Sequence, residues 1–242
     1  MAKVSVIIPA AGAGKRFAAK GNKIFQRIGD KPVFIRTMEA FTSRDDVVQT
    51  LLVAAEADLP ELRERYGGHL GFMDVQIVPG GPTRSESVRK ALANVCDDAH
   101  LVCVHDAVRP CISQLWIDAV FKEAAKSGAA ILAYPVHGTL KKVSAEGVID
   151  ATVCREGLWE AQTPQVFAAD LIRRAYETDA DATDDAELVQ KLGHGVSVVM
   201  GDPRNIKITT RADLDFAAAV IKTLPKPKPK NLGINPMSDA QW

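Results

Sequence analysis

Apolar and polar residues change their spacing in a regular way along the chain. Short runs of apolar, β-branched residues predict strands, namely Val4–Pro9, Val47–Ala54, Val75–Pro79, Leu101–His105, Ala129–Val136 and Val196–Met200. Amphipathic stretches between them predict helices, namely Pro32–Thr42, Leu59–Tyr66, Ser85–Asn94, Gln114–Ser127, Ala169–Thr178, Asp184–Leu192 and Arg211–Thr223. Strands that alternate with helices imply parallel pairing through crossover helices. We therefore expect an α/β fold, a three-layer sandwich around a mostly parallel, twisted sheet.

One segment in the second half of the chain interrupts this alternation. Thr139–Val143 and Val148–Val153 flank the turn-forming residues Ser144–Gly147, a pattern typical of a β-hairpin. After the hairpin we expect irregular chain as far as Pro164. A two-stranded hairpin has too little core to be stable alone. This protruding arm, about residues 136–160, should therefore pack against another surface, such as a second subunit.

The C-terminal residues differ in composition from the rest. Pro and Lys alternate from Pro225 to Lys230, a pattern typical of extended, polyproline-like chain. We expect residues 225–242 to be a disordered tail and residues 1–224 to form a single domain. A basic docking tail, in which these lysines bind nucleic acid, is the alternative.

Composition excludes several classes of protein. The 242 residues hold 30 Lys and Arg against 30 Asp and Glu, so the formal net charge is zero and indicates no nucleic-acid partner. Hydrophobic residues make up 47% of the chain and charged residues 25%, as in a folded globular protein. No apolar run approaches the ~20 residues that span a bilayer, and the N-terminal run lacks a signal-peptide pattern, so we expect no membrane partner. The four cysteines show no metal or disulfide spacing, which favours a reducing cytoplasm.

The zero net charge hides two blocks of opposite charge. Residues 15–36 carry seven basic residues against one acid, Asp30. Residues 175–190 carry six acids and no Lys or Arg. A neutral chain can therefore present a locally cationic site to anionic substrates.

The basic block begins in a glycine-rich turn after the first strand, Pro9-Ala10-Ala11-Gly12-Ala13-Gly14-Lys15-Arg16. Backbone N–H groups in such a turn can approach an anion closely. The turn matches neither common nucleotide-binding motif. Phe17 replaces the third glycine of G-x-G-x-x-G, and Arg16 follows Lys15 where a P-loop has Ser or Thr. The cations that follow, as far as Lys23, suit a triphosphate, whereas a tight turn with incidental glycines is the plain alternative.

Further segments occur in the order typical of one enzyme family. They are Gly80–Val88, Val104–Pro110, Thr139–Lys141, Arg155, Leu158–Gln165, Thr183–Ala186 and Asn205–Thr209. With the glycine-rich turn and Lys23, they are similar to the 2-C-methyl-D-erythritol 4-phosphate cytidylyltransferase family, and the turn resembles that of nucleotide-sugar-type nucleotidyltransferases. The resemblance spans about residues 4–222, nearly everything except the tail. One departure is Asn22, where many relatives have Pro before the lysine.

The resemblance implies a CTP-dependent nucleotidyltransferase. The family joins CTP to 2-C-methyl-D-erythritol 4-phosphate in the non-mevalonate isoprenoid pathway, with Mg²⁺ as cofactor, and releases pyrophosphate. A phosphate oxygen attacks the α-phosphorus in line, so the protein must position two anions and neutralise their charge. A phosphate monoester is nucleophilic near neutral pH, and no general base is required.

The matching positions imply roles for individual residues. Arg16 and Lys23 would stabilise the transition state. Lys207 would orient the acceptor phosphate, assisted by Arg155. Room for the phosphates of CTP would come from Gly12 and Gly14. The cytosine pocket would be lined by Ala10, Ala11, Gly80, Gly81 and Ser87, the last of which is also a helix-end residue. Further substrate contacts would come from Pro9, Arg84, Ala107, Arg109, Thr139, Thr163 and Thr183.

Asp106 follows a predicted strand, at the edge where parallel sheets bind their ligands. The resemblance implies that it faces both nucleotide and acceptor, and its carboxylate makes it a candidate Mg²⁺ ligand. A salt bridge to Arg109 is the alternative. His105 is expected to be a structural residue of the strand end rather than a base.

The family's hairpin arm crosses to a partner subunit. The resemblance therefore implies a homodimer in which Thr139 and Arg155 serve the neighbouring site. Two other functions stay open: a ribitol-phosphate cytidylyltransferase, which uses the same machinery on another polyol, and a nucleotide-binding regulatory module without catalysis. Retention of Asp106 and of the cations Arg16, Lys23 and Lys207 argues against the second.

Overall fold

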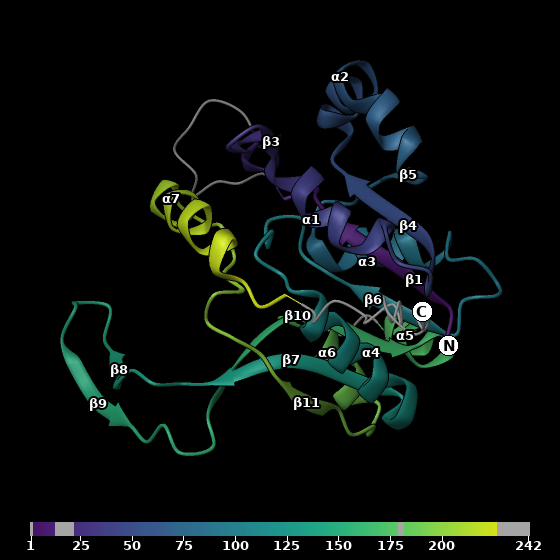
Figure 1. Cartoon of the computed structure of the whole chain (residues 1–242). Coiled ribbons are helices and arrows are strands. Elements are labelled where there is room, and N and C mark those ends of the chain that lie inside the picture. Colours follow the sequence, from purple (N-terminus) through teal and green to yellow (C-terminus); the bar gives the residue numbers. More distant parts are fainter. Residues whose placement is uncertain (1, 13–21, 179–181, 227–242) are drawn as a thin grey trace, which may run out of the picture.

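The fold is built on one sheet of seven strands (Figure 1). In the computed structural model, which describes residues 2–12, 22–178 and 182–226, the strand order is β11-β7-β10-β6-β1-β4-β5. The strands are β1 (Val4–Pro9), β4 (Val47–Ala54), β5 (Val75–Pro79), β6 (Leu101–Val104), β7 (Ala129–Pro135), β10 (Trp159–Ala168) and β11 (Ser197–Met200). Neighbouring strands run parallel except at β10, which is antiparallel to both β6 and β7. The prediction of a mostly parallel sheet is confirmed.

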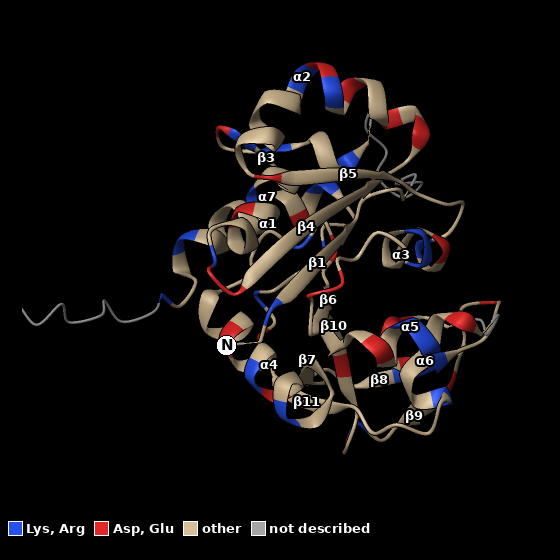
Figure 2. Cartoon of the chain, turned by 90° about the vertical axis from the view of Figure 1, so that its right-hand side faces the viewer, with Lys and Arg blue, Asp and Glu red and all other residues tan. Residues whose placement is uncertain are grey.

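Helices cover both faces of this sheet, because successive residues of its strands enter two different apolar cores. In β4, Leu52 and Ala54 join one core, while Leu51 and Val53 join the other. The first core takes side chains from α1 (Val33–Thr42), α2 (Leu59–Phe72), α4 (Gln114–Ser127) and α7 (Arg211–Val220). The second takes them from α3 (Arg84–Leu92), α5 (Ala169–Glu177) and α6 (Asp185–Lys191). Figure 2 shows many charged residues on the helices around the sheet, whereas β4 and β5 have none. The three-layer sandwich is therefore confirmed.

Most predicted boundaries lie close to the observed ones, and the differences involve short elements. Helix α2 continues past Tyr66 to Phe72. The hydrophobic pattern does not predict the small ladder of β2 (Arg27–Ile28) and β3 (Lys31–Pro32), nor the 3-10 helices η1 (Lys23–Phe25) and η2 (Glu56–Asp58). The helix predicted over Arg211–Thr223 ends in a 3-10 turn, η3 (Ile221–Thr223). Gly29 turns the chain between β2 and β3 with a φ of +62°, which glycine adopts without strain.

The expectation of irregular chain before Pro164 is wrong from Trp159 onward, because β10 begins there and contains Pro164. Proline is rare inside a central strand, since it cannot donate to the ladder. The structure places Pro164 where the register between β10 and β7 shifts, between Ala161 and Gln165. Regular pairing with β6 begins only at Gln165. The missing N–H therefore interrupts no regular ladder pair.

The predicted hairpin is present and protrudes from the rest of the fold (Figure 1). β8 (Leu140–Val143) pairs antiparallel with β9 (Ile149–Val153), and Ser144 N donates a 2.9 Å hydrogen bond to Val148 O in the turn. Gly147 adopts a φ of +82° there. Every residue of both strands is exposed, so the arm has no core of its own.

The carboxyl ends of the central parallel strands meet at one edge of the sheet. β1 ends at Pro9, β5 at Pro79 and β6 at Val104. β10 runs the other way, and its Gln165 pairs with Val104, so the residues just before Gln165 lie at this edge too. Residues from the first turn, the middle of the chain and β10 therefore converge there.

The chain beyond α7 folds back onto α4. Ser113, the N-cap of α4, donates a 2.6 Å hydrogen bond from its hydroxyl to Pro225 O. The predicted tail from residue 227 onward lies outside the described residues. Among the helices of the described ranges, none has the length and apolar character needed to cross a bilayer.

Candidate active site

A cavity of about 320 Å³ opens at the carboxyl edge of the sheet. It lies between the first βα turn, the start of α3 and the segment that follows β11. Its lining residues are Pro9, Ala10, Ala11, Gly12, Lys23, Ile24, Pro82, Thr83, Arg84, Ser87, Asp106, Val108, Lys207 and Thr209. The structure thus brings together most of the residues predicted to contact nucleotide.

Two glycines allow the turn after β5 to approach the turn after β1. A Cβ on Gly80 would lie 2.6 Å from Ala11 Cβ and 3.0 Å from Ser87 Oγ. A Cβ on Gly81 would lie 2.6 Å from Glu86 Cβ. The backbone hydrogen bond from Gly80 N to Ala54 O, at 2.7 Å, fixes this approach. Gly80 and Gly81 therefore shape the cavity wall from behind, whereas Ala11 and Ser87 line it.

Ser87 has a defined structural role at the start of α3. Its hydroxyl donates to Thr83 O at 2.8 Å and accepts from Gly81 N at 3.0 Å. Thr83 caps the same helix through a capping box with Glu86, which fixes the first turn. The helix-end role of Ser87 is therefore real, and it coexists with a place on the cavity wall.

Lys23 reaches this cavity from the short helix η1. Ile24 is buried and anchors η1 to the core. Asn22 caps η1 by accepting a hydrogen bond from Ile24 N at 3.3 Å, and its amide donates to Asp58 at 2.7 Å. The asparagine that departs from the family pattern thus fixes the lysine's segment to η2.

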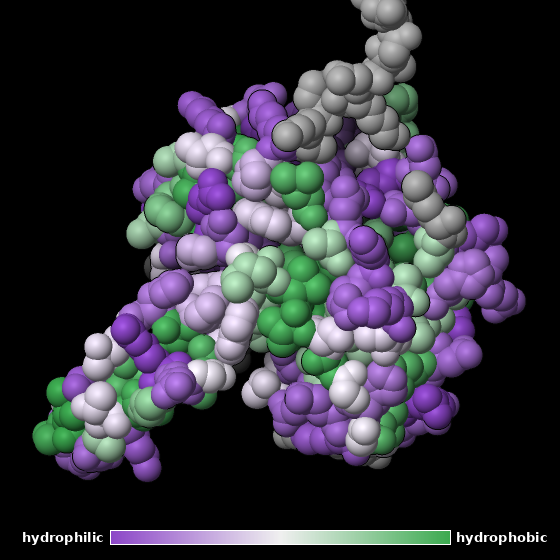
Figure 3. Space-filling model, turned by 60° about the horizontal axis from the view of Figure 1, so that its bottom comes forward, coloured by the Kyte–Doolittle hydropathy of each residue, from purple (hydrophilic) through white to green (hydrophobic). Residues whose placement is uncertain are grey.

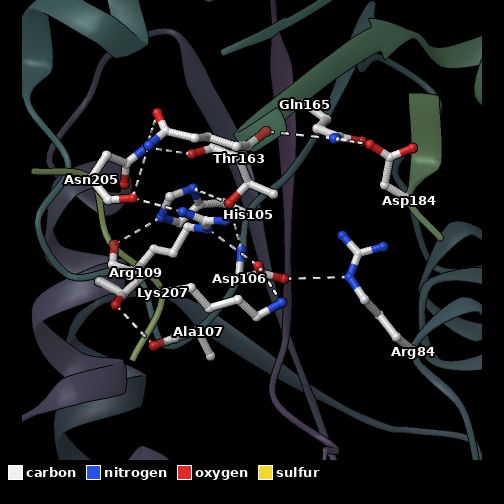
Figure 4. Close-up of polar contacts among 12 residues, drawn as sticks. Arg84, His105, Asp106, Ala107, Arg109, Thr163, Gln165, Asp184, Asn205 and Lys207 are labelled. Atoms are coloured by element: carbon white, nitrogen blue, oxygen red, sulfur yellow. Dashed lines mark hydrogen bonds and ion pairs between the residues drawn. The ribbon is translucent and has the colours of Figure 1, made fainter. Parts of the chain in front are cut away.

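Asp106 lies among three cations, two residues after the end of β6 (Figure 4). Lys207 Nζ is 2.8 Å from Asp106 Oδ2, Arg109 Nε is 3.4 Å from the same oxygen, and Arg84 Nε is 3.3 Å from Oδ1. Burial alone would raise the pKa of this carboxyl, but the charges of Arg84, Lys207 and Arg109 outweigh it and hold the pKa well below its usual range. The carboxylate is therefore ionised. The salt bridge to Arg109, held as an alternative to a metal role, is present.

A second cavity, of about 240 Å³, lies on the other side of this ion cluster. It is lined by Arg84, Asp106, Arg109, Ala161, Gln162, Thr163, Gln165, Thr183, Asp184 and Lys207. Arg84, Asp106 and Lys207 line both cavities, so they form a shared wall. Two adjacent cavities with a cationic wall between them suit two anionic molecules that must meet.

His105 fixes the backbone around Asp106. Its Nε2 lies 3.0 Å from Arg109 O, which only accepts, and its Nδ1 lies 3.0 Å from Thr163 Oγ1. Burial lowers the pKa of His105 to about 4, so the neutral ring donates from Nε2 and accepts the Thr163 hydroxyl proton at Nδ1. Thr163 Oγ1 in turn accepts from Asp106 N at 3.1 Å. The structural role expected for His105 agrees with these contacts.

The segment that carries Lys207 is held by two buried side chains. Arg109 Nη1 donates to Asn205 O at 2.6 Å, and Gln162 Nε2 donates to Asp202 O at 2.9 Å. The backbone of Ile208 donates to Val108 O at 2.9 Å. Arg109 thus supports the lysine's segment as well as pairing with Asp106. Gln162 is not predicted as a site residue from the sequence, where its only signal is its place in the family-like segment before Pro164.

The structure does not bring every predicted residue to the cavities. Thr139 and Arg155 are exposed and lie on or beside the arm, where Arg155 donates to His137 O. Ala107 is buried behind the first cavity and accepts a hydrogen bond from Thr37 at 2.9 Å. Gly14 and Arg16 lie outside the described residues. Thr183 lines the second cavity, with its hydroxyl bonded to Glu187 at 3.0 Å.

Among the described residues, there is no group of three or more His, Cys, Asp or Glu side chains that could hold a metal ion. Both oxygens of Asp106 already pair with cations. A metal that enters this site must therefore find most of its ligands elsewhere, and the phosphate oxygens of a nucleotide are of the type that Mg²⁺ prefers.

Comparisons with known proteins converge on one family. Residues 4–223 match the family model of 2-C-methyl-D-erythritol 4-phosphate cytidylyltransferase. The protein of that name from Rhodopirellula baltica is 42% identical over 233 residues, which cover 91% of this chain and 95% of the relative. The Halalkalibacterium halodurans protein of that name is 40% identical, over 90% of this chain and 96% of the relative. The crystal structure of the Thermus thermophilus protein of that name has a TM-score of 0.77 and 33% identity, over 91% of this chain and 99% of that one.

Proposed function

Because the chain belongs to the 2-C-methyl-D-erythritol 4-phosphate cytidylyltransferase family, we propose that it joins CTP to 2-C-methyl-D-erythritol 4-phosphate in isoprenoid biosynthesis. The observation that carries the proposal is the wall of Arg84, Asp106 and Lys207 between two cavities. One cavity is bordered by the glycine-containing turns and suits the nucleotide. The other is lined by the hydroxyl residues Thr163 and Thr183 and by two arginines, Arg84 and Arg109. It suits a polyol phosphate.

The reaction is an in-line substitution at phosphorus. An oxygen of the acceptor phosphate forms a bond to the α-phosphorus of CTP, and the bond from this phosphorus to the bridging oxygen of the β-phosphate breaks. Pyrophosphate leaves with the electron pair of that bond. No proton must be removed from a phosphate monoester that is ionised near neutral pH, so positioning and charge neutralisation suffice.

The basic side chains neutralise different phosphate groups, according to the cavity that each one lines. Lys23 lines only the first cavity, where it faces the triphosphate, and Arg16 would join it from the turn. Lys207 lies on the shared wall, where the attacking phosphate meets the α-phosphate. A donor set fixed before the substrates bind stabilises the transition state without reorganisation.

We propose that Mg²⁺ enters this site with the triphosphate of CTP. When bound, Mg²⁺ supplies positive charge to the phosphate oxygens. The sequence indicates Asp106 as a candidate Mg²⁺ ligand. Its oxygens pair with Lys207, Arg84 and Arg109, so a role in positioning these basic side chains fits better. The protein's own contribution is the cationic wall.

We further propose that the enzyme is a cytoplasmic homodimer whose arms complete the neighbouring sites. The arm exposes Val148 by 63%, Ile149 by 58% and Val143 by 51%, and Figure 3 shows apolar residues at its tip. A two-stranded hairpin with such side chains needs a second surface to be stable. Thr139 and Arg155 lie outside the cavities of their own chain, which suits a role in the partner's acceptor site.

The decisive experiment is a panel of acceptors assayed with CTP and Mg²⁺ for pyrophosphate release. Turnover of 2-C-methyl-D-erythritol 4-phosphate far above that of ribitol phosphate supports the proposal. A preference for ribitol phosphate would change the acceptor and keep the chemistry. Binding of CTP with no turnover of any polyol phosphate would indicate a regulatory module instead.

A further inference from the structure

Arg84 is held from two sides by carboxylates. Its Nη1 and Nη2 donate to Asp185 at 3.1 and 2.7 Å, a bidentate pair, and its Nε donates to Asp106 at 3.3 Å. A planar guanidinium with these partners has one orientation. Arg84 also lines both cavities, so this orientation shapes the wall that the two substrates share (Figure 4).

Asp185, to which the sequence pattern assigns no role, is fixed in turn. It is fully buried, its N–H donates to Gln165 Oε1 at 3.1 Å, and its carboxylate accepts from the Tyr176 hydroxyl. Burial, helped by the charge of Asp185, raises the pKa of Tyr176 well above its usual range, so the phenol stays neutral and donates. Asp185 lines neither cavity. The carboxylate of Asp185 therefore reaches the cavity wall through Arg84.

The charges in this cluster do not cancel. Arg84, Arg109 and Lys207 contribute three positive charges, whereas Asp106 and Asp185 contribute two negative ones. Among these five groups, one positive charge remains. Removing the charge of Asp185 would increase this surplus and at the same time release the guanidinium from its bidentate partner.

We propose that Asp185 is a positioning residue that holds Arg84 in place, so that Asp106 stays between Arg84 and Lys207 at the wall between the cavities. The inference rests on the proposed function, because it requires two anionic substrates to meet at this wall. A released Arg84 would follow Asp106 or a substrate phosphate. The cluster would then attract anions at least as strongly, but would hold them in a less productive position.

Asp185→Asn tests this prediction in steady-state kinetics of the full chain with CTP, 2-C-methyl-D-erythritol 4-phosphate and Mg²⁺. We expect kcat to fall about tenfold or more, since small misplacements of reacting groups are costly. We expect the KM of both substrates to stay unchanged or to fall, because the positive charge of the cluster increases. A purely structural role of Asp185 would lower Tm and leave kcat per folded enzyme unchanged.

A double-mutant cycle with Arg84→Lys shows whether the effect passes through Arg84. If it does, the double variant is no slower than the slower single variant, because both changes remove the same interaction. The matched control is Asp170→Asn, which removes an exposed carboxylate that pairs with Arg173 on α5 at 3.9 Å. This control should keep the parental kcat.

Tyr176→Phe keeps the inference testable should Asp185→Asn fail to fold. It preserves the charge of Asp185 and removes one hydrogen bond to it, so kcat should fall by about two- to fivefold with unchanged KM. Parental kinetics in both variants, losses that multiply with Arg84→Lys, or a raised KM at constant kcat would each overturn the inference. A parent enzyme without turnover would instead overturn the proposed function, and the inference with it.

Discussion

Lys207 Nζ lies 2.8 Å from Asp106 Oδ2, on the wall that two cavities share. The pair joins residues far apart in the chain, and it places a half-exposed cation against a buried carboxylate. Because Lys207 lines both cavities, its ammonium group can contact an anion bound in either one. The wall and the elements that support it can be tested by substitution, by pH and by mixing variants.

Lys207→Met should lower kcat/KM by about 100-fold or more, because it removes a fixed cation at the point where the phosphates meet. Lys207→Arg should recover part of this loss, since it keeps the charge and changes the geometry. Pyrophosphate release with CTP and 2-C-methyl-D-erythritol 4-phosphate measures both. Parental activity in Lys207→Met would remove this lysine from the site.

Lys23→Ala should lower kcat by a similar factor while Tm stays near the parental value, because Lys23 lines the nucleotide cavity and its neighbour Ile24 anchors the segment. The control is Lys31→Ala, which removes a surface cation that pairs with Glu39 at 2.7 Å. Arg16→Ala should resemble Lys23→Ala. Full activity in both Lys23→Ala and Arg16→Ala would contradict the proposed roles.

Gly80→Ala should weaken CTP binding and lower Tm, because the new Cβ would lie 2.6 Å from Ala11 Cβ. Titration calorimetry with CTP and thermal melts measure the two effects. Gly67→Ala is the matched control: Gly67 lies inside α2, and a Cβ there would meet no atom within 4 Å, so this change should stabilise the protein by about 0.5–1 kcal/mol. Equal behaviour of the two variants would refute the close approach of the turns.

The stability of the protein should depend on pH through His105. Burial lowers its pKa to about 4 in the folded state, from about 6.5 in the unfolded chain. The unfolded state therefore binds the proton more readily between these values, and the free energy of unfolding should fall as the pH falls from about 6.5 to 4. His105→Gln should flatten this dependence by an amount on the order of 1–3 kcal/mol. Urea unfolding at several pH values measures it, with the exposed His69→Gln as control; an unchanged profile in His105→Gln would contradict the assignment.

Mixing two inactive variants tests whether the arm serves the neighbouring subunit. Arg155→Ala impairs the arm, and Lys207→Met impairs the wall, so each homodimer lacks a functional site. A mixed dimer would contain one intact site, with Lys207 from one subunit and Arg155 from the other. Activity that appears only after subunit exchange confirms the shared site, whereas an inactive mixture with proven exchange contradicts it. Ile149→Asp on the exposed arm should in addition shift sedimentation toward the monomer.

The sequence predicts most of this fold because its parallel strands are continuous apolar runs that are buried on both faces, as Leu51 and Leu52 of β4 show. The strand β10 escapes prediction for a physical reason. Pro164 argues against a strand locally, and only the register shift against β7 makes room for it. The local sequence around Pro164 does not show that β7 pairs beside it, because this pairing forms only in the folded structure.

Some features of the site can also be predicted from the sequence, and others cannot. The glycine-rich turns and Lys23 are recognisable because their chemistry lies in consecutive residues. The bidentate pair of Arg84 and Asp185 is not, since 101 residues separate its partners. The family resemblance indicates Arg84 as a substrate contact, but it does not predict which carboxylate holds it. The same holds for Gln162, which supports the Lys207 segment across 40 residues through Asp202 O.

β10 connects the arm to the carboxyl edge of the central sheet. It begins at Trp159, where the arm returns, and continues directly through Thr163 to its pairing with β6. The surface on which a partner would close and the surface on which the acceptor would bind are thus successive stretches of one strand. Linkage then makes the two events reciprocal: whatever factor association adds to acceptor affinity, the acceptor must add to association. In a cell that is rich in the acceptor, the substrate itself would hold the dimer together.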